Sequence, residues 1–151
     1  MDKIQNELSQ YRGKYFSSQW PTIYEMFSIS AARFPQRPCF TTFDPHRKTL
    51  TYAQVDELIK KAASHMISAG VRKGDKVTLN GKNSVQWAIA YLAINYIGAV
   101  IVPIDNQLHI DRVQRLAAFA DSVYLIADFD VISKMDKEDE WFRNLKGMMC
   151  L

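Results

Sequence analysis

The stretch Val77–Asp105, VTLNGKNSVQWAIAYLAINYIGAVIVPID, decides the fold of this chain. It begins with a short β-prone run that is followed by a polar turn, and Ser84 stands where it can cap the N-terminus of a helix. Gly98 takes the position of a left-handed C-cap residue, and the β-prone run Ala99–Val102 comes next. The stretch therefore predicts one strand, one helix and a second strand.

The predicted helix is apolar around most of its circumference. Between Val85 and Ile97 only Gln86 and Asn95 are strongly polar, so this helix must be covered on more than one side. Its length of about 13 residues is too short to cross a bilayer, which needs about 20. We therefore expect a core helix, followed by a strand that is closed by Pro103.

Two amphipathic helices are predicted before this unit. Thr22 with Glu25, and Thr51 with Gln54, match the capping-box pattern that starts a helix. The first helix is expected to run to Phe34. The second shows the clearest three-and-four spacing in the chain, with apolar residues on one face at Val55, Leu58, Ile59, Ala62, Ala63, Met66 and Ile67.

The segments around these helices are shorter. Residues 1–19 are polar and mixed, and we expect a lead-in segment with at most one helical turn, ahead of a single domain over residues 20–151. Cys39–Phe43 and Thr49–Thr51 are β-prone runs on either side of a turn-forming segment. They predict a small antiparallel hairpin.

The pattern continues after the central stretch and then weakens. We expect a short helix over Ile110–Ala120, a buried strand over Ser122–Ala127 and one more helix over Phe129–Met135. Asp136–Glu140 is a charge run whose simplest interpretation is a solvated loop. The final residues, Lys146–Leu151, show no capping residue and no polar tail, which is typical of a truncated chain.

Alternation of helices and strands predicts an α/β fold, with a mostly parallel twisted sheet, helices on both faces and a small N-terminal antiparallel hairpin. In such sheets ligands bind beyond the carboxyl ends of the strands. The candidate ligand loops are therefore Asn80–Ser84, Asp105–Leu108 and Asp128.

Composition narrows the classes of function. The chain has 151 residues and is 48% apolar, which is enough for one domain with a core. Its net charge of +3 comes from 19 basic and 16 acidic residues that are interspersed, so nucleic acid is not an expected partner. Cys39 and Cys150 are far apart, and the N-terminus lacks an apolar signal core. We expect a reduced, cytoplasmic protein without a transmembrane segment, which a membrane surface could still recruit.

The turn Asn80–Ser84 invites comparison with a phosphate-binding loop, because Gly and Lys lie between a strand and a helix N-terminus. The G-x-x-x-x-G-K-[S/T] pattern would need Gly at Lys76 and Ser or Thr at Asn83. A plain turn with a helix cap is the favoured interpretation, and an anion or substrate contact stays open.

Catalytic, cofactor-binding and metal-binding residues are not predicted anywhere in the chain. His46, His65 and His109 lack metal-ligand spacing. Asp105 and Asp128 lie at the expected ligand edge, where Asp is more often a turn former or a helix cap. There is no G-x-S-x-G elbow, and neither cysteine has a nearby histidine in the sequence.

An ordered set of short segments points to one family. The segments are F-P-Q-R-P-C-F (34–40), L-T-Y-A-Q-V-D-E-L (50–58), G-V-R-K-G-D-K-V (70–77), K-N-S-V-Q-W-A-I-A-Y-L-A (82–93), G-A-V-I-V-P-I-D (98–105) and Y-L-I-A-D (124–128). Over residues 20–128 this order resembles the N-terminal portion of the adenylate-forming acyl-CoA synthetases, the AMP-binding superfamily. The N-S-x-x-W and V-P-I-D variants look closest to long-chain fatty acyl-CoA ligases.

The resemblance implies an activity for a longer parent protein. Members of the family join a carboxylic acid to ATP, with Mg²⁺, and pass the acyl group from the adenylate to CoA. They do so with a Ser/Thr/Gly-rich loop ending in P-K-G, a Y-G-x-T-E segment, a hinge Asp and a C-terminal Lys, none of which occurs in these 151 residues. We therefore expect an inactive N-terminal fragment of a ligase, without bound cofactor. Its partner would be the remainder of the parent chain, and its exposed apolar surface would favour self-association.

A second hypothesis is of another class. A free-standing, non-catalytic α/β module that binds a small ligand or a partner protein would also lack these motifs. The coding frame beyond Leu151 separates the two hypotheses, because only the ligase fragment requires a Thr/Ser/Gly-rich loop to follow.

Overall fold

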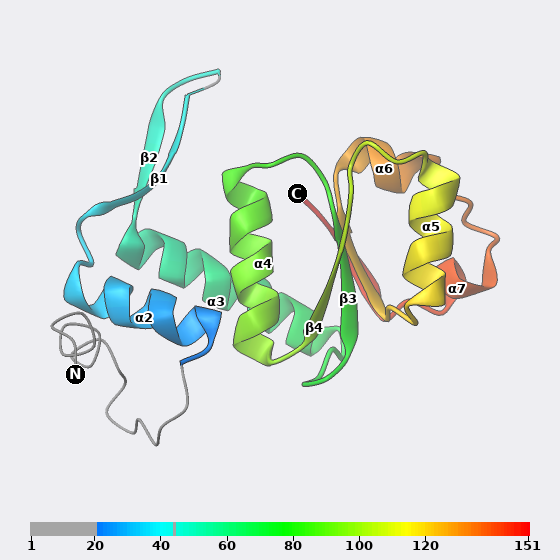
Figure 1. The fold of residues 1–151 in the computed structure, drawn as a ribbon, viewed down its shortest axis with the longest axis horizontal. Coiled ribbons are helices and arrows are strands. Elements are labelled where there is room, and N and C mark those ends of the chain that lie inside the picture. The colour runs from blue at the N-terminus through cyan, green and yellow to red at the C-terminus, as the bar shows by residue number, and fades with distance from the viewer. Residues whose placement is uncertain (1–20, 44) are drawn as a thin grey trace, which may run out of the picture. The chain divides into compact units, whose positions relative to one another are not determined.

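The computed structural model describes residues 21–43 and 45–151, so the predicted lead-in over 1–19 lies outside the described residues. The chain forms two compact units, with the boundary between Glu57 and Leu58. Figure 1 shows the elements in chain order.

The first unit contains one helix and a hairpin. Helix α2 (Ile23–Arg33) starts at the predicted capping box, in which Glu25 N donates to Thr22 Oγ1 at 3.2 Å and Thr22 N donates to Glu25 Oε2 at 2.6 Å. Strands β1 (Pro38–Thr42) and β2 (Lys48–Thr51) pair antiparallel, which confirms the predicted hairpin.

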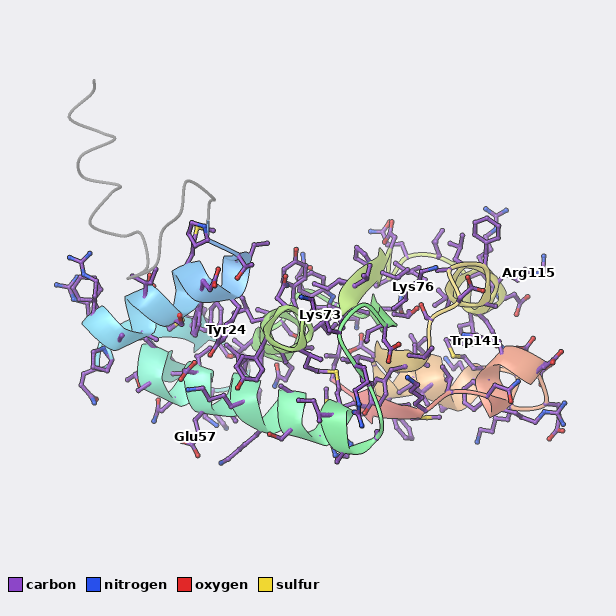
Figure 2. The ribbon with its side chains drawn as sticks, turned by 90° about the horizontal axis from the view of Figure 1, so that it is seen from below. Tyr24, Glu57, Lys73, Lys76, Arg115 and Trp141 are labelled. Carbon is purple, nitrogen blue, oxygen red and sulfur yellow. The ribbon has the colours of Figure 1, made fainter. Side chains whose placement is uncertain are left out.

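Little of this first unit is fully buried. Ala31 and Val55 are the buried apolar residues among the described residues up to Glu57. Tyr24, labelled in Figure 2, donates its hydroxyl to Asp56 Oδ1 at 3.0 Å and thereby ties α2 to the start of helix α3 (Tyr52–Ser68).

Helix α3 begins at the second predicted capping box, since Gln54 N donates to Thr51 Oγ1 at 3.3 Å and Thr51 N donates to Gln54 Oε1 at 2.9 Å. Its buried stripe is narrower than the predicted face. Leu58 and Ile67 are 37% and 42% exposed, because they lie at the margins of the stripe. The residues that are buried are Val55, Ile59, Ala63 and Met66.

The second unit is built on a four-stranded parallel sheet. Its strands are β3 (Lys76–Asn80), β4 (Val100–Ile104), β5 (Tyr124–Ala127) and β6 (Gly147–Cys150), in the spatial order β4-β3-β5-β6. All residues of β5 are buried, as its continuous apolar sequence predicts. The parallel sheet and the antiparallel hairpin confirm the predicted fold class.

The sequence prediction was wrong at the end of the chain. It assigned no element to Lys146–Leu151, where the structure has strand β6. Lys146 N donates to Val123 O at 2.8 Å and so starts the pairing with β5. The strand was missed because a four-residue run gives no period that distinguishes a strand from a loop.

Strand β4 also extends further than predicted, because Pro103 lies inside it and does not close it. β4 is an edge strand, where proline is tolerated. Val100 N donates to Asp75 O on the β3 side at 2.8 Å. By alternation, the nitrogen of Pro103 faces the outer edge, where no hydrogen bond within the sheet is lost.

Helices cover both faces of this sheet. Figure 1 shows α4 (Val85–Ile97) on one face and α5 (Ile110–Phe119) and α6 (Phe129–Lys134) on the other. Helix α4 has the predicted caps, with Ser84 Oγ accepting from Trp87 N and Gly98 at φ 76°. Its buried residues cover more than half of its circumference, as expected: Ile89, Ala90, Leu92, Ala93 and Ile94.

The predicted charged loop is partly helical. Asp139 Oδ1 accepts from Trp141 N and Phe142 N and so caps α7 (Glu140–Arg143). The core on this face contains buried residues from α5, from the strands and from the C-cap of α6: Ile104, Val113, Ala117, Leu125, Ala127 and Met135.

Candidate functional site

The order of the strands defines one point at which a ligand would be expected. From β3 the chain crosses to β4 at one side, and from β5 it crosses to β6 at the other side. The crevice at such a reversal, outside the carboxyl ends of the strands, is the usual ligand position in open α/β sheets. Here it lies between the ends of β3 and β5, at Asn80 and Ala127.

A pocket of about 330 Å³ lies at this reversal point. Its lining includes Lys82, Asn106 and Asp128, one residue from each of the three loops that the sequence predicted. The rest of the lining comes from the first turn of α6: Phe129, Asp130 and Val131. The sequence predicts a helix over these residues but does not place them among the ligand loops.

The Asp128 carboxylate closes the loop after β3. Its Oδ2 accepts a hydrogen bond from Lys82 N at 3.0 Å. Gly81 is buried beside it, and a Cβ at this position would lie 3.2 Å from Asp128 Oδ1 and would collide with the side chain of Leu151. This close approach explains why the loop contains glycine.

Asn80 joins the ends of two strands. Its Nδ2 donates to Ile104 O and to Asp105 O, each at 3.1 Å, so the carboxyl ends of β3 and β4 are fixed to each other. The side chain is fully buried, and its Oδ1 has no hydrogen-bond partner in the structure. Asn80 therefore has a structural role at the carboxyl ends of the strands.

These residues do not fit a nucleotide phosphate. An anion at a helix N-terminus requires free backbone N–H groups. Here Lys82 N is bonded to a carboxylate and Trp87 N to the Ser84 hydroxyl, and the carboxylates of Asp128 and Asp130 line the same pocket. The geometry supports the turn-and-cap interpretation, and no chemical step can be assigned to this loop.

The residues considered as metal ligands or nucleophiles lie apart. Among residues 21–43 and 45–151 no three His, Cys, Asp or Glu side chains gather to hold a metal ion. His109 Nδ1 lies 3.4 Å from Asp111 Oδ2 on an exposed turn, and His46 and His65 are on separate elements. Burial raises the pKa of the Cys39 thiol, which disfavours the nucleophilic thiolate.

A second pocket, of about 480 Å³, lies at the amino end of β5, opposite to the usual ligand edge. Trp141, labelled in Figure 2, forms one wall and donates from Nε1 to Ser122 O at 2.7 Å. The indole thereby fixes α7 to the sheet, so this side chain has a structural role.

None of the helices in the described part of the chain has the length and apolarity that a membrane span requires.

Comparisons with known proteins show the family of this chain. The family described as AMP-binding enzyme matches residues 27–147. Medium-chain acyl-CoA ligase ACSF2, mitochondrial, of Mus musculus is 34% identical over 84 residues, which are 56% of this chain and 14% of that protein. Syringomycin synthase SyrB1 of Pseudomonas syringae pv. syringae is 32% identical over 106 residues, which are 70% of this chain and 17% of that protein.

A solved structure has the same fold. The inhibitor-bound N-terminal domain of FACL13 from Mycobacterium tuberculosis aligns with a TM-score of 0.78 and 23% identity, over 87% of this chain and 34% of that chain. The chain thus spans well under half of each protein compared. Since the family match covers most of its length and the observed sheet agrees with it, the chain belongs to the AMP-binding enzyme family.

Proposed function

We propose that this chain forms the N-terminal α/β subdomain, over residues 20–151 after a lead-in of 1–19, of an ATP-dependent acyl-CoA synthetase. The observation that supports the proposal most is the family match over residues 27–147, together with the parallel sheet of the second unit. The short segments that resemble long-chain fatty acyl-CoA ligases favour a fatty acid as the carboxylic acid substrate.

In this proposal the chain is a scaffold. A carboxylate becomes an acyl donor when adenylation gives it a good leaving group, and ATP, Mg²⁺ and CoA would serve that chemistry in the longer protein. The residues at the sheet edge are used for structure: Asn80 holds two strand ends and Asp128 holds the loop after β3. The chain itself is proposed to be inactive and to reside in the cytoplasm.

Pyrophosphate release tests this proposal. The 151-residue chain, mixed with ATP, Mg²⁺ and a series of fatty acids, is expected to release pyrophosphate only at the background rate. A chain extended along the coding frame beyond Leu151 is expected to contain a Thr/Ser/Gly-rich loop and to show fatty acid-dependent release. Robust release from the 151 residues, or an extended chain without carboxylic acid-dependent release, would contradict the proposal.

The pocket between β3 and β5 favours one alternative, a non-catalytic module that binds a small ligand. A stop codon directly after Leu151, together with saturable binding of a small molecule that is lost in Asp128→Ala, would support the module and not the ligase.

We also propose that the 151-residue chain self-associates. Several large apolar side chains of the second unit are exposed, and surfaces of this kind commonly mark an interface. The exposed residues are Leu58, Ile67, Tyr96, Val100, Leu116, Phe119, Phe129 and Met148.

A further inference from the structure

Asn80 is followed by Gly81, and this is the only Asn-Gly pair in the sequence. An asparagine side chain in this position is chemically labile. Glycine has no side chain, so nothing hinders the approach of its backbone nitrogen to the side-chain carbonyl carbon of the preceding residue. Asn80 therefore combines a structural role with a reactive sequence.

The reaction that this pair can undergo is deamidation, and it consumes only water. Gly81 N gives its proton to hydroxide and attacks Asn80 Cγ, so that an N–Cγ bond forms and the Cγ–Nδ2 bond breaks. Nδ2 takes a proton from water and leaves as ammonia, and a five-membered succinimide remains. Water then adds to either carbonyl of the ring and breaks its C–N bond, which gives aspartate or isoaspartate at residue 80.

The fold keeps water and the leaving group from this reaction. Asn80 is fully buried, and Gly81 beside it is buried as well, so hydroxide has no access to the Gly81 amide. The leaving group Nδ2 is held in place, because it donates to Ile104 O and to Asp105 O at 3.1 Å each. Loss of ammonia would require both hydrogen bonds to break.

The backbone of β3 adds a geometric barrier. Ring closure requires Asn80 Cβ and Gly81 N to lie on the same side of the Cα–C bond, whereas the extended conformation of a strand turns them apart. Asn80 is paired with Ile104 of β4 on one side and with Ala127 of β5 on the other. The peptide group therefore cannot turn unless β3 separates from its neighbours.

Asn83 provides a comparison within the same loop. It is exposed, and it lies between the end of β3 and the start of α4. Ser84 follows it, and the side chain of Ser84 hinders the attack that Gly81 leaves open. By sequence Asn80 is thus the more reactive of the two asparagines, and in the fold it is the more protected.

We propose that Asn80 is a deamidation site that is protected in the folded chain and becomes reactive when the chain unfolds. The product cannot restore the native contacts. An ionised aspartate at residue 80 only accepts hydrogen bonds, and it would face the carbonyl oxygens of Ile104 and Asp105 inside the protein. Deamidation of the unfolded chain therefore makes unfolding irreversible. The inference goes beyond the proposed synthetase and does not depend on it.

Peptide mapping by mass spectrometry, with separation of aspartate from isoaspartate, tests the proposal on the unmodified chain. Samples are incubated in mildly alkaline buffer, either folded or in guanidinium chloride. Asn80 is expected to convert at least about tenfold more slowly in the folded chain, because only the opened fraction reacts. Asn83 is the internal control: it is expected to convert faster than Asn80 in the folded chain and more slowly than Asn80 in denaturant.

Gly81→Ala tests the chemistry without any demand on folding. In the fold a Cβ at this position would collide with the side chain of Leu151, so the variant is compared with the unmodified chain in guanidinium chloride alone. Conversion at Asn80 is expected to slow by about tenfold or more, because a side chain now hinders the attacking nitrogen.

Asn80→Asp reproduces the main product and tests its effect on the fold. It is expected to unfold at a lower urea concentration than Asn80→Ala, because both variants lack the two donors and only aspartate buries a charge. In the same way, the fraction of the unmodified chain that is deamidated in denaturant is expected to refold to a less stable state after the denaturant is removed.

Each outcome bears on one part of the proposal. Equal rates at Asn80 in the folded and the denatured chain, or equal protection of Asn83, would overturn the protected site. A rate that Gly81→Ala leaves unchanged would overturn the role of glycine. Full recovery of stability by the deamidated chain would overturn irreversibility. None of these results bears on pyrophosphate release by an extended chain.

Discussion

Asn80 shows how one buried amide can fix the candidate site. Replacing it by alanine removes two hydrogen bonds and leaves Ile104 O and Asp105 O without these donors. We expect Asn80→Ala to lower the free energy of unfolding by about 2–3 kcal/mol, because each lost bond costs about 1 kcal/mol and buried acceptors lose a partner. Urea denaturation measures the change.

Asn83 provides the matched control for this variant. It lies three residues along the same loop and is exposed, so Asn83→Ala should change the free energy of unfolding by less than about 0.5 kcal/mol. If both substitutions lowered the free energy of unfolding equally, the hydrogen bonds of Asn80 would not be the cause of the loss.

Tyr124 has a buried hydroxyl without a hydrogen-bond partner. Its side chain is fully buried, no hydrogen bond is formed by its hydroxyl, and burial raises the pKa of its phenol. We expect Tyr124→Phe to be neutral or to raise the free energy of unfolding by up to about 1 kcal/mol, because an unsatisfied group is removed while the ring is kept. Thermal denaturation measures this.

The control for Tyr124 removes the ring. Tyr124→Ala should cost about 3–5 kcal/mol, as truncation of large buried aromatic residues does. A clear loss of stability in Tyr124→Phe would instead reveal a partner for the hydroxyl, such as a buried water.

Asp75 makes stability depend on pH. The Lys146 ammonium, which donates to this carboxylate, holds the pKa of Asp75 below its usual range, and Arg72 N–H assists. A lower pKa in the folded state means that the unfolded chain binds more protons, so stability rises with pH through this range. The contribution of the Asp75 carboxylate to the free energy of unfolding is complete above the usual pKa of Asp. It is lost as the pH falls through the pKa of Asp75 in the folded state.

Asp75→Asn should remove about 1 kcal/mol at neutral pH and flatten this acid dependence in urea titrations. Asp121→Asn is the control, because Asp121 is 85% exposed and lies 3.4 Å from Lys76. It should change stability by less than about 0.5 kcal/mol. If the free energy of unfolding of Asp75→Asn still depended on pH in the same way in acid, other carboxylates would be the cause of that dependence.

At the scale of elements, Gly98 ends α4 with a left-handed residue. Its φ of 76° disfavours any side chain, so Gly98→Ala should cost about 1 kcal/mol in thermal denaturation. Gly98→Asn is the control, because asparagine tolerates the left-handed region better than alanine and should cost less stability. If both variants lost equal stability, the left-handed conformation would not be the cause.

Capping and periodicity explain which elements the sequence predicted well. Thr22, Thr51 and Ser84 each accept the bond that their spacing predicts, because a cap depends only on residues within one turn. Strand β6 depends instead on pairing with β5, and a run as short as Gly147–Cys150 has no signal of its own. Non-local pairing is therefore what sequence reasoning missed.

At the scale of the whole molecule, the sequence predicted the candidate site in part. The positions of Lys82, Asn106 and Asp128 follow from the rule that ligand loops lie at the carboxyl ends of parallel strands. The bond from Lys82 N to Asp128 could not be predicted, because it joins loops 46 residues apart and depends on the strand order. The family resemblance added the proposed class of activity for a longer protein, which the geometry of these residues does not provide.

The outward nitrogen of Pro103 has one more consequence. The outer side of β4 lacks the N–H donor of residue 103, so no further strand can form a regular ladder along this side of the sheet. This side of the sheet is therefore protected against edge-to-edge aggregation, which commonly begins at an unpaired strand.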